Sequence, residues 1–112
     1  MSAAARLEEM RASVVARIAQ MDGDMAALVA ASRGSNADDE HDPEGATIAF
    51  ERQQVAALLD QARRRLADVD AAVTAVEAGT YGRCTGCQAE IPEERLELRP
   101  FAGTCVRCTA AR

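Results

Sequence analysis

The sequence predicts a mostly α-helical protein, a long antiparallel helical hairpin (coiled coil) that carries a small cysteine-rich head at its C-terminal end. Three observations predict this fold. Two segments repeat apolar residues at steps of three and four, a polar segment separates them, and four cysteines form two pairs near the C-terminus. We expect the hairpin to occupy residues 1–78, with an acidic tip at about residues 34–45, and the head to occupy residues 79–112.

Length and composition exclude several classes of protein. The 112 residues suffice for one small domain, or for one hairpin with a head. A net charge of -5 argues against general affinity for duplex DNA or for an anionic membrane surface. Aromatic residues make up only 3% of the chain, which excludes proteins that stack nucleic-acid bases on rows of aromatic side chains. With His41 as the one histidine, no nucleophile–base–carboxylate set can be assembled, so we do not expect an enzyme.

The N-terminal segment gives no sign of export. It lacks the apolar core of a signal peptide, and no stretch approaches the roughly 18 apolar residues of a membrane span. We therefore expect a cytoplasmic protein with no membrane partner. In that reducing compartment, regularly spaced cysteines are more often metal ligands than disulfides.

The first helix is expected over about residues 5–33. Its apolar residues recur at steps of three and four, which is the pattern of one helix face. Gly23 is expected to weaken or bend this helix without ending it. The residues of the stripe are Leu7, Met10, Val14, Ile18, Met21, Met25 and Leu28.

The second helix follows the polar segment and is expected from about Pro43 to Glu77. Pro43 suits an early helical position, Asp42 is a candidate N-cap, and Gly79 is the expected C-terminal cap. Steps of four and three along this segment give the heptad spacing of a coiled-coil seam. The residues of the seam are Val55, Leu59, Ala62, Leu66, Val69, Val73 and Val76.

The cysteines form two C-x-x-C pairs, Cys84 with Cys87 and Cys105 with Cys108, separated by seventeen residues. This spacing is typical of a zinc site in which four thiolates complete a tetrahedron. Because four sulfur ligands leave no open position for water, we expect one structural Zn²⁺ in a four-cysteine zinc-finger head. A thiol redox switch and an iron site are the alternatives.

Other residues of the head have expected structural roles. Residues 91–96 suggest a short helical turn, and Leu98 and Phe101 are expected in the core of the head. Glycines are expected to ease its tight turns at Gly82, Gly86 and Gly103. Basic and acidic side chains in the head nearly cancel, which argues against a finger that reads DNA sequence.

Several arginines are candidates for docking a partner protein. Arg63 and Arg64 belong to a basic run on the second helix, and a solvated face paired with nearby aspartates is the alternative interpretation. Arg95 and Arg99 lie between the two cysteine pairs and are further docking candidates.

The sequence Gly79-Thr80-Tyr81-Gly82-Arg83-Cys84-Thr85-Gly86-Cys87 resembles the zinc finger of the TraR/DksA family. The likeness continues at Ile91, Arg95, Leu96, Pro100, Cys105 and Cys108. The resemblance implies a regulator of bacterial transcription that binds RNA polymerase, inserts the hairpin tip into the secondary channel and modulates initiation, often together with ppGpp. The chain resembles a short member, which implies that parts of a ppGpp site built from terminal extensions are absent.

The resemblance also implies a functional tip. The tip residues are Asp38, Asp39, Asp42, Glu44 and Ala46. Best-known members carry Asp-x-x-Asp-x-Ala at the tip, whereas an ungapped count from the first cysteine places His41 and Glu44 at the two aspartate positions here. A solvated turn is the alternative for the acidic tip. For the whole chain, the alternatives are a zinc-stabilised helical-hairpin adaptor and a thiol redox sensor.

Overall fold

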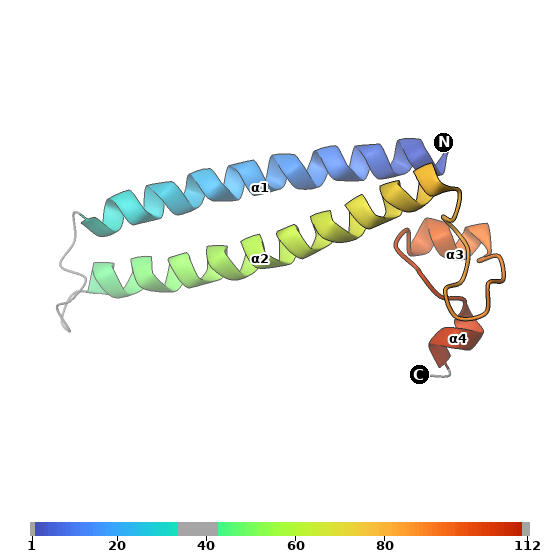
Figure 1. Cartoon of the computed structure of the whole chain (residues 1–112). Coiled ribbons are helices and arrows are strands. Elements are labelled where there is room, and N and C mark those ends of the chain that lie inside the picture. Colours follow the sequence, from blue (N-terminus) through green and yellow to red (C-terminus); the bar gives the residue numbers. More distant parts are fainter. Residues whose placement is uncertain (1, 34–42, 111–112) are drawn as a thin grey trace. The chain divides into compact units, whose positions relative to one another are not determined.

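The computed structural model describes residues 2–33 and 43–110. It contains four helices: α1 (Ala3–Arg33), α2 (Pro43–Ala78), α3 (Glu93–Leu98) and α4 (Val106–Ala110) (Figure 1). Within the described ranges there is no strand, and one isolated antiparallel bridge joins Arg83 to Glu90. The predicted helical class is therefore confirmed, and the two long helices have nearly their predicted bounds.

The chain divides into two compact units. One unit comprises Ala12–Leu66, which we call the hairpin unit. The other comprises Met1–Arg11 together with Ala67–Arg112, which we call the base unit. The start of α1 and the end of α2 therefore belong with the cysteine-rich head, whereas the sequence places them with the rest of the hairpin.

In the hairpin unit, α1 and α2 run antiparallel. Val14 lines a groove with Leu58, and Leu28, further along α1, lines a groove with Val55, earlier on α2. The core consists of Met21, Leu59 and Ala62. Ile18, Met25 and Val55 pack against this core. These residues all lie on the two predicted stripes, so the predicted seam is confirmed in this unit.

Ion pairs on the hairpin unit lie at its surface. Arg63 reaches Asp22 of α1 at 3.3 Å, and Arg64 reaches Asp60 one turn earlier on α2 at 3.4 Å. All four side chains are more than half exposed. Solvent screens such pairs, and each contributes at most about 1 kcal/mol.

The base unit buries the ends of the same stripes. Leu7 and Val69 are almost completely buried, and Ala72 is buried as well although the predicted seam did not include it. Arg11 of α1 donates from Nε to a carboxylate oxygen of Asp70 at 2.7 Å. Ala72 is three residues after Val69 and so lies on the same helix face, which explains its burial.

Local signals set the helix ends. α1 begins at Ala3, two residues earlier than predicted, because Ser2 caps it. The Oγ of Ser2 accepts a hydrogen bond from the backbone N–H of Ala5 at 3.1 Å. Gly79 ends α2 with a φ of 75°, as predicted. The N–H of Thr80 donates to the carbonyl of Ala75 and that of Gly79 to Val76, a Schellman arrangement. Gly23 lies within the continuous helix α1.

Pro43 is the first residue of α2, as predicted, while the proposed cap Asp42 lies outside the described residues. None of the helices in the described part of the chain is long and apolar enough to cross a membrane.

One expectation about the head is wrong. Leu98 was predicted in the core of the head, but its side chain is 85% exposed. The buried residue of α3 is Leu96, and because successive helical residues are about 100° apart, Leu98 points to roughly the opposite side. Phe101 is half-buried.

Candidate metal centre

The first cysteine pair lies in a turn held by backbone hydrogen bonds. The N–H of Cys84 donates to the carbonyl of Ala89 at 2.8 Å, and the N–H of Gln88 donates back to the carbonyl of Cys84 at 2.9 Å. Gln88 has a φ of 65°, the left-handed conformation that reverses the chain. Cys84 is completely buried and Cys87 is exposed, so the pair spans the finger from core to surface.

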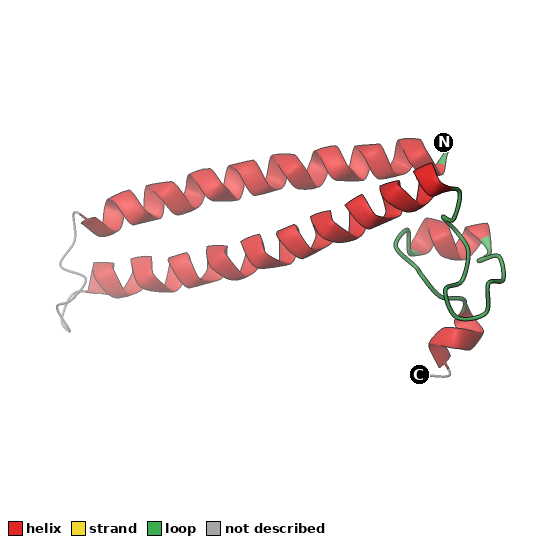
Figure 2. Cartoon of the chain, viewed as in Figure 1, coloured by secondary structure: helices red, strands yellow, loops and turns green. Residues whose placement is uncertain are grey.

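The second cysteine pair lies where a loop enters a short helix. Cys105 directly precedes α4 and Cys108 lies within it. Figure 2 shows the loop that leads into this helix. The loops of the two pairs are joined by Thr85, whose N–H donates to the carbonyl of Gly103 at 2.9 Å. The head contains two short helices and connecting loops, and its buried residues are Cys84, Ile91 and Leu96.

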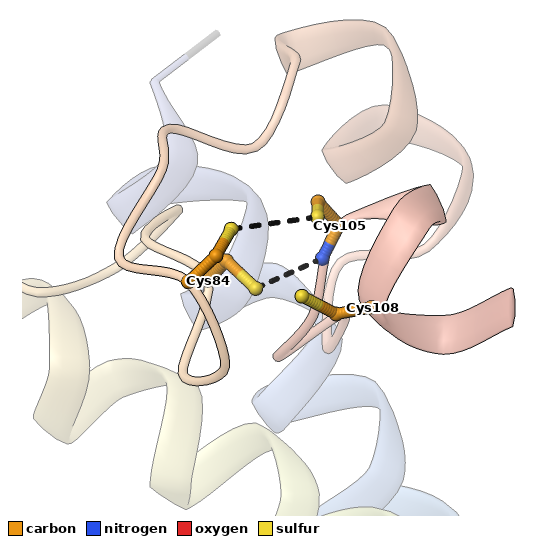
Figure 3. Close-up of side chains that lie close together, drawn as sticks. Cys84, Cys105 and Cys108 are labelled. Carbon is orange, nitrogen blue, oxygen red and sulfur yellow. Dashed lines mark hydrogen bonds between the residues drawn. The ribbon is translucent and has the colours of Figure 1, made fainter. Parts of the chain in front are cut away.

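The structure brings the four cysteines together. Their sulfur atoms all lie within 4.8 Å of one another, and Figure 3 shows Cys84, Cys105 and Cys108 converging. The sulfurs of Cys87 and Cys105 are 3.8 Å apart. A tetrahedron with Zn–S bonds of about 2.3 Å has S···S edges of about 3.8 Å, whereas a disulfide needs about 2.05 Å. The cluster therefore has the dimensions of a zinc site with four cysteine ligands.

Backbone N–H groups favour the thiolate at the first cysteine of each pair. The N–H groups of Cys105, Cys87 and Gly86 donate to the sulfur of Cys84 and lower its pKa to about 6. The N–H of Cys108 likewise lowers the pKa of Cys105. The hydrogen bonds that the Cys108 thiol donates to the neighbouring cysteine sulfurs, together with burial, raise the pKa of Cys108 to about 12. Negative charge is thus favoured at Cys84 and Cys105, whereas four thiolates together need a cation between them.

The donor set limits which metal the cluster can hold. Four thiolates in a tetrahedron suit Zn²⁺ or an iron–sulfur centre, and the cluster is sized for a single ion. With all four positions filled by sulfur, water has no coordination site and the ion has no catalytic role. The chemistry of this centre is structural, because binding one ion joins two segments of chain.

The comparisons with known proteins agree with this geometry. The family model of the prokaryotic dksA/traR C4-type zinc finger matches residues 79–112. The structure is similar to that of transcription factor DksA2 from Pseudomonas aeruginosa, with a TM-score of 0.83 and 25% sequence identity over 97% of this chain and 78% of that one.

Residues 79–112 therefore form a finger of the DksA/TraR C4 type, and the chain is similar in fold to a DksA protein. Its head is a C4-type zinc finger with one structural Zn²⁺. The predicted resemblance to the DksA/TraR family, the predicted fold and the predicted cofactor are thereby confirmed.

Curated relatives match over parts of their length. The uncharacterized protein YteA of Bacillus subtilis is 42% identical over 66 residues, which is 59% of this chain and 28% of YteA. General stress protein 16O of the same organism is 34% identical over 76 residues, covering 68% of this chain and 47% of that protein. An uncharacterized protein of Aquifex aeolicus is 44% identical over 43 residues, 38% of this chain and 30% of that one. The matched part is thus less than half the length of each relative.

Within this DksA/TraR finger, glycines act in different ways. Gly82 has a φ of 82°, and a Cβ there would lie 3.1 Å from Leu96, so both conformation and space favour glycine. Gly86 leaves room for the cluster, because its Cβ would lie 2.9 Å from the sulfur of Cys108. Gly103 meets nothing within 4 Å and has no positive φ, so the predicted turn role does not require glycine there.

Replacing Gly86 by alanine is expected to weaken zinc binding by about tenfold or more, because the added methyl group displaces the sulfur of Cys108. The measurement is competition for zinc against a chromophoric chelator. Gly103→Ala is the matched control and should bind zinc as the wild type does. Equal affinities for Gly86→Ala and the wild type would contradict the assigned role of Gly86.

The predicted tip lies mostly outside the described residues. This applies to Asp38, Asp39 and Asp42, and to His41. Glu44 and Ala46, in the first turn of α2, are exposed. The roles of the tip residues therefore remain predictions from the family resemblance.

The predicted docking arginines differ in their surroundings. Arg63 and Arg64 are in the exposed ion pairs described above, and Arg99 is exposed. Arg95 is half-buried, and its guanidinium donates hydrogen bonds within the finger. A surface role thus suits Arg63, Arg64 and Arg99 better than Arg95.

Tyr81 contributes to the finger in a way that the sequence did not predict. Its hydroxyl donates to the carbonyl of Pro100 at 2.9 Å, which ties the entry of the finger to the loop before the second cysteine pair. Burial raises the pKa of Tyr81, so the hydroxyl keeps its proton and remains a donor. The sequence signal that could have indicated this role is a tyrosine among glycines near the first cysteine pair.

Proposed function

We propose that this chain is a DksA-like regulator of transcription that acts by binding RNA polymerase. The observation that carries the proposal is the structural likeness to transcription factor DksA2, which extends over 97% of the chain and so includes both the hairpin and the finger. A match confined to the finger would support a zinc site alone. We do not propose an enzyme, since the metal centre has no open coordination position.

In this proposal, Cys84, Cys87, Cys105 and Cys108 hold the structural Zn²⁺. The distances between their sulfurs and the lowered pKa values of Cys84 and Cys105 support the assignment. When bound, the ion supplies a rigid cross-link between the two cysteine pairs. The protein therefore presents a folded finger next to the ends of α1 and α2, which belong to the same compact unit.

The tip is the proposed effector of the regulation. Carboxylates of the tip would enter the secondary channel of the polymerase and act on cationic or metal-bearing groups there. The exposure of Glu44 and Ala46 in the first turn of α2 supports this role, because both side chains are accessible to a partner. A joint action with ppGpp is part of the same proposal.

Exposed arginines are the proposed docking contacts. Arg63 and Arg64 have side chains that are 60% and 72% exposed, and their carboxylate partners lie on the same surface. Exposed pairs of this kind contribute little to stability. Arg63 and Arg64 could therefore exchange Asp22 and Asp60 for acidic groups on the polymerase at a small cost in free energy. Sequence-specific recognition of DNA is not part of the proposal, given the net charge of -5.

An adaptor function would need a second apolar stripe on the hairpin. Among the described residues of α1 and α2, the large exposed apolar side chains are Val15, Phe50 and Leu58. They do not form a run at steps of three and four, so they do not supply such a stripe. This favours the regulator over the adaptor.

The experiment that tests the role of the tip is transcription in vitro with the RNA polymerase of the same organism. The double variant Asp42→Ala with Glu44→Ala is expected to bind polymerase but to lose the effect of the wild type on the lifetime of open complexes. Glu8→Ala with Glu9→Ala removes two exposed carboxylates from α1 and is the matched control. An unchanged effect in the tip variant would contradict the proposed role of the tip.

A further inference from the structure

The side chain of Arg95 contacts both ends of the second cysteine pair. Its Nε donates to the backbone carbonyl of Thr104 at 3.2 Å, and a terminal nitrogen donates to Oγ1 of Thr109 at 3.3 Å. Thr104 directly precedes Cys105, and Thr109 directly follows Cys108. One guanidinium therefore holds the two residues that flank this pair.

The two cysteine pairs differ in how the backbone supports them. The first pair lies in a turn closed by reciprocal bonds, described above, and by the bridge between Arg83 and Glu90. The second pair lies at the start of α4, which has five residues and no buried residue. A helix this short is not stable by itself in water, so the second pair needs support from elsewhere.

Arg95 is well placed to give that support. It lies on α3, next to Leu96, which is one of the three buried residues of the finger core. Its own side chain is half-buried, so part of it is shielded from solvent. The hydroxyls of Thr104 and Thr109 also bond to each other, which closes the loop around the second pair.

The chemistry of the side chain matters as well as its charge. A guanidinium is planar and offers several N–H donors in a fixed arrangement, so it can bond a carbonyl and a hydroxyl at once. A lysine ammonium is a flexible point charge and would not hold both acceptors in fixed positions. Groups around a metal site that orient its ligands commonly change metal affinity by about 10- to 100-fold when they are mutated.

We propose that Arg95 is a positioning residue of the metal centre, which holds Cys105 and Cys108 in place and thereby slows the loss of zinc. The proposal rests on the assignment of the four cysteines as zinc ligands and is independent of polymerase binding. It also separates Arg95 from Arg99, four residues later, which is exposed and for which no side-chain bond is found within the described residues.

The first test measures zinc release from the zinc-loaded full chain into an excess of a chromophoric chelator. Arg95→Met is expected to release zinc about tenfold faster than the wild type or more. Arg95→Lys should also be faster, because its charge remains but the two bonds do not. Arg99→Met is the matched control and should release zinc at the wild-type rate. A wild-type rate for Arg95→Met would overturn the proposal.

A double-variant comparison tests the contact with Thr109. Thr109→Val removes one acceptor of the guanidinium and is expected to speed zinc release in the same direction, by less than Arg95→Met does. In the Arg95→Met background it should add little, because the bond is already absent. Fully additive effects would mean that the two residues act independently, against the proposal.

A second readout separates positioning from general destabilisation. The chain is alkylated while zinc is being released, and each cysteine is followed by mass spectrometry. In Arg95→Met, Cys105 and Cys108 are expected to react before Cys84 and Cys87. Equal reaction of all four cysteines would assign the change to general loss of structure and overturn the proposal. If the wild type bound no zinc, the ligand assignment would fail and this proposal with it.

Discussion

Removal of zinc is expected to unfold the finger while most of the helical signal remains. Structural zinc in small fingers contributes about 10–16 kcal/mol at neutral pH, whereas burial of a side chain such as Ile91 or Leu96 contributes about 1.5–3 kcal/mol. The finger core is therefore too small to replace the metal. The helices α1 and α2 have 31 and 36 residues, against 6 and 5 for α3 and α4, so helix content should fall only slightly.

Circular dichroism and amide NMR spectra, recorded before and after treatment with a chelator, measure this outcome. Resonances of the finger should collapse to unfolded positions, those of the hairpin unit should persist, and re-added zinc should restore the finger. Cys84→Ser should reproduce the effect without a chelator, and Gly103→Ala is the control that leaves the cluster intact. A finger that keeps dispersed resonances after zinc is removed would contradict this interpretation.

Replacing Leu59 by alanine is expected to reduce the free energy of unfolding by about 2–5 kcal/mol. Leu59 is 5% exposed and belongs to the core of the hairpin unit with Met21 and Ala62. Removing its side chain leaves a cavity between two helices that bury only one stripe each. Denaturant unfolding followed by circular dichroism measures the change.

The adjacent residue supplies the control for this prediction. Leu58→Ala removes the same atoms from a side chain that is 43% exposed, and it should cost no more than about 1 kcal/mol. Both variants make the same change in helix propensity. The difference between their free energies of unfolding therefore measures the contribution of the buried position in the seam. Equal losses for the two variants would mean that the predicted stripe is not the core of the hairpin unit.

The long helices and the metal centre could be predicted because their signals are local and periodic. Seven apolar residues at steps of three and four specify the buried face of α1, and all of them are buried or half-buried. Gly79 specifies the end of α2, since a positive φ is needed there. The cysteine spacing predicts the cluster because two residues between thiolates allow both to face one ion.

The interior of the finger could not be predicted in the same way. Its short helices have no long pattern, so the burial of Leu96 and the exposure of Leu98 depend on the phase of a six-residue helix. The bonds from Arg95 join residues nine and fourteen positions apart through a loop that the sequence does not specify. The reason for glycine at position 86 is likewise a contact across the cluster with Cys108.

Equilibrium binding of the zinc-loaded chain to core RNA polymerase from the same organism is the decisive test of the proposed function. We expect saturable binding that a DksA protein of that organism, or another ligand of the secondary channel, displaces. The tip variant of Asp42 and Glu44 should bind with similar affinity, because docking is assigned to other residues. Absence of binding at tens of micromolar, with zinc bound and the finger folded, would contradict the proposed function.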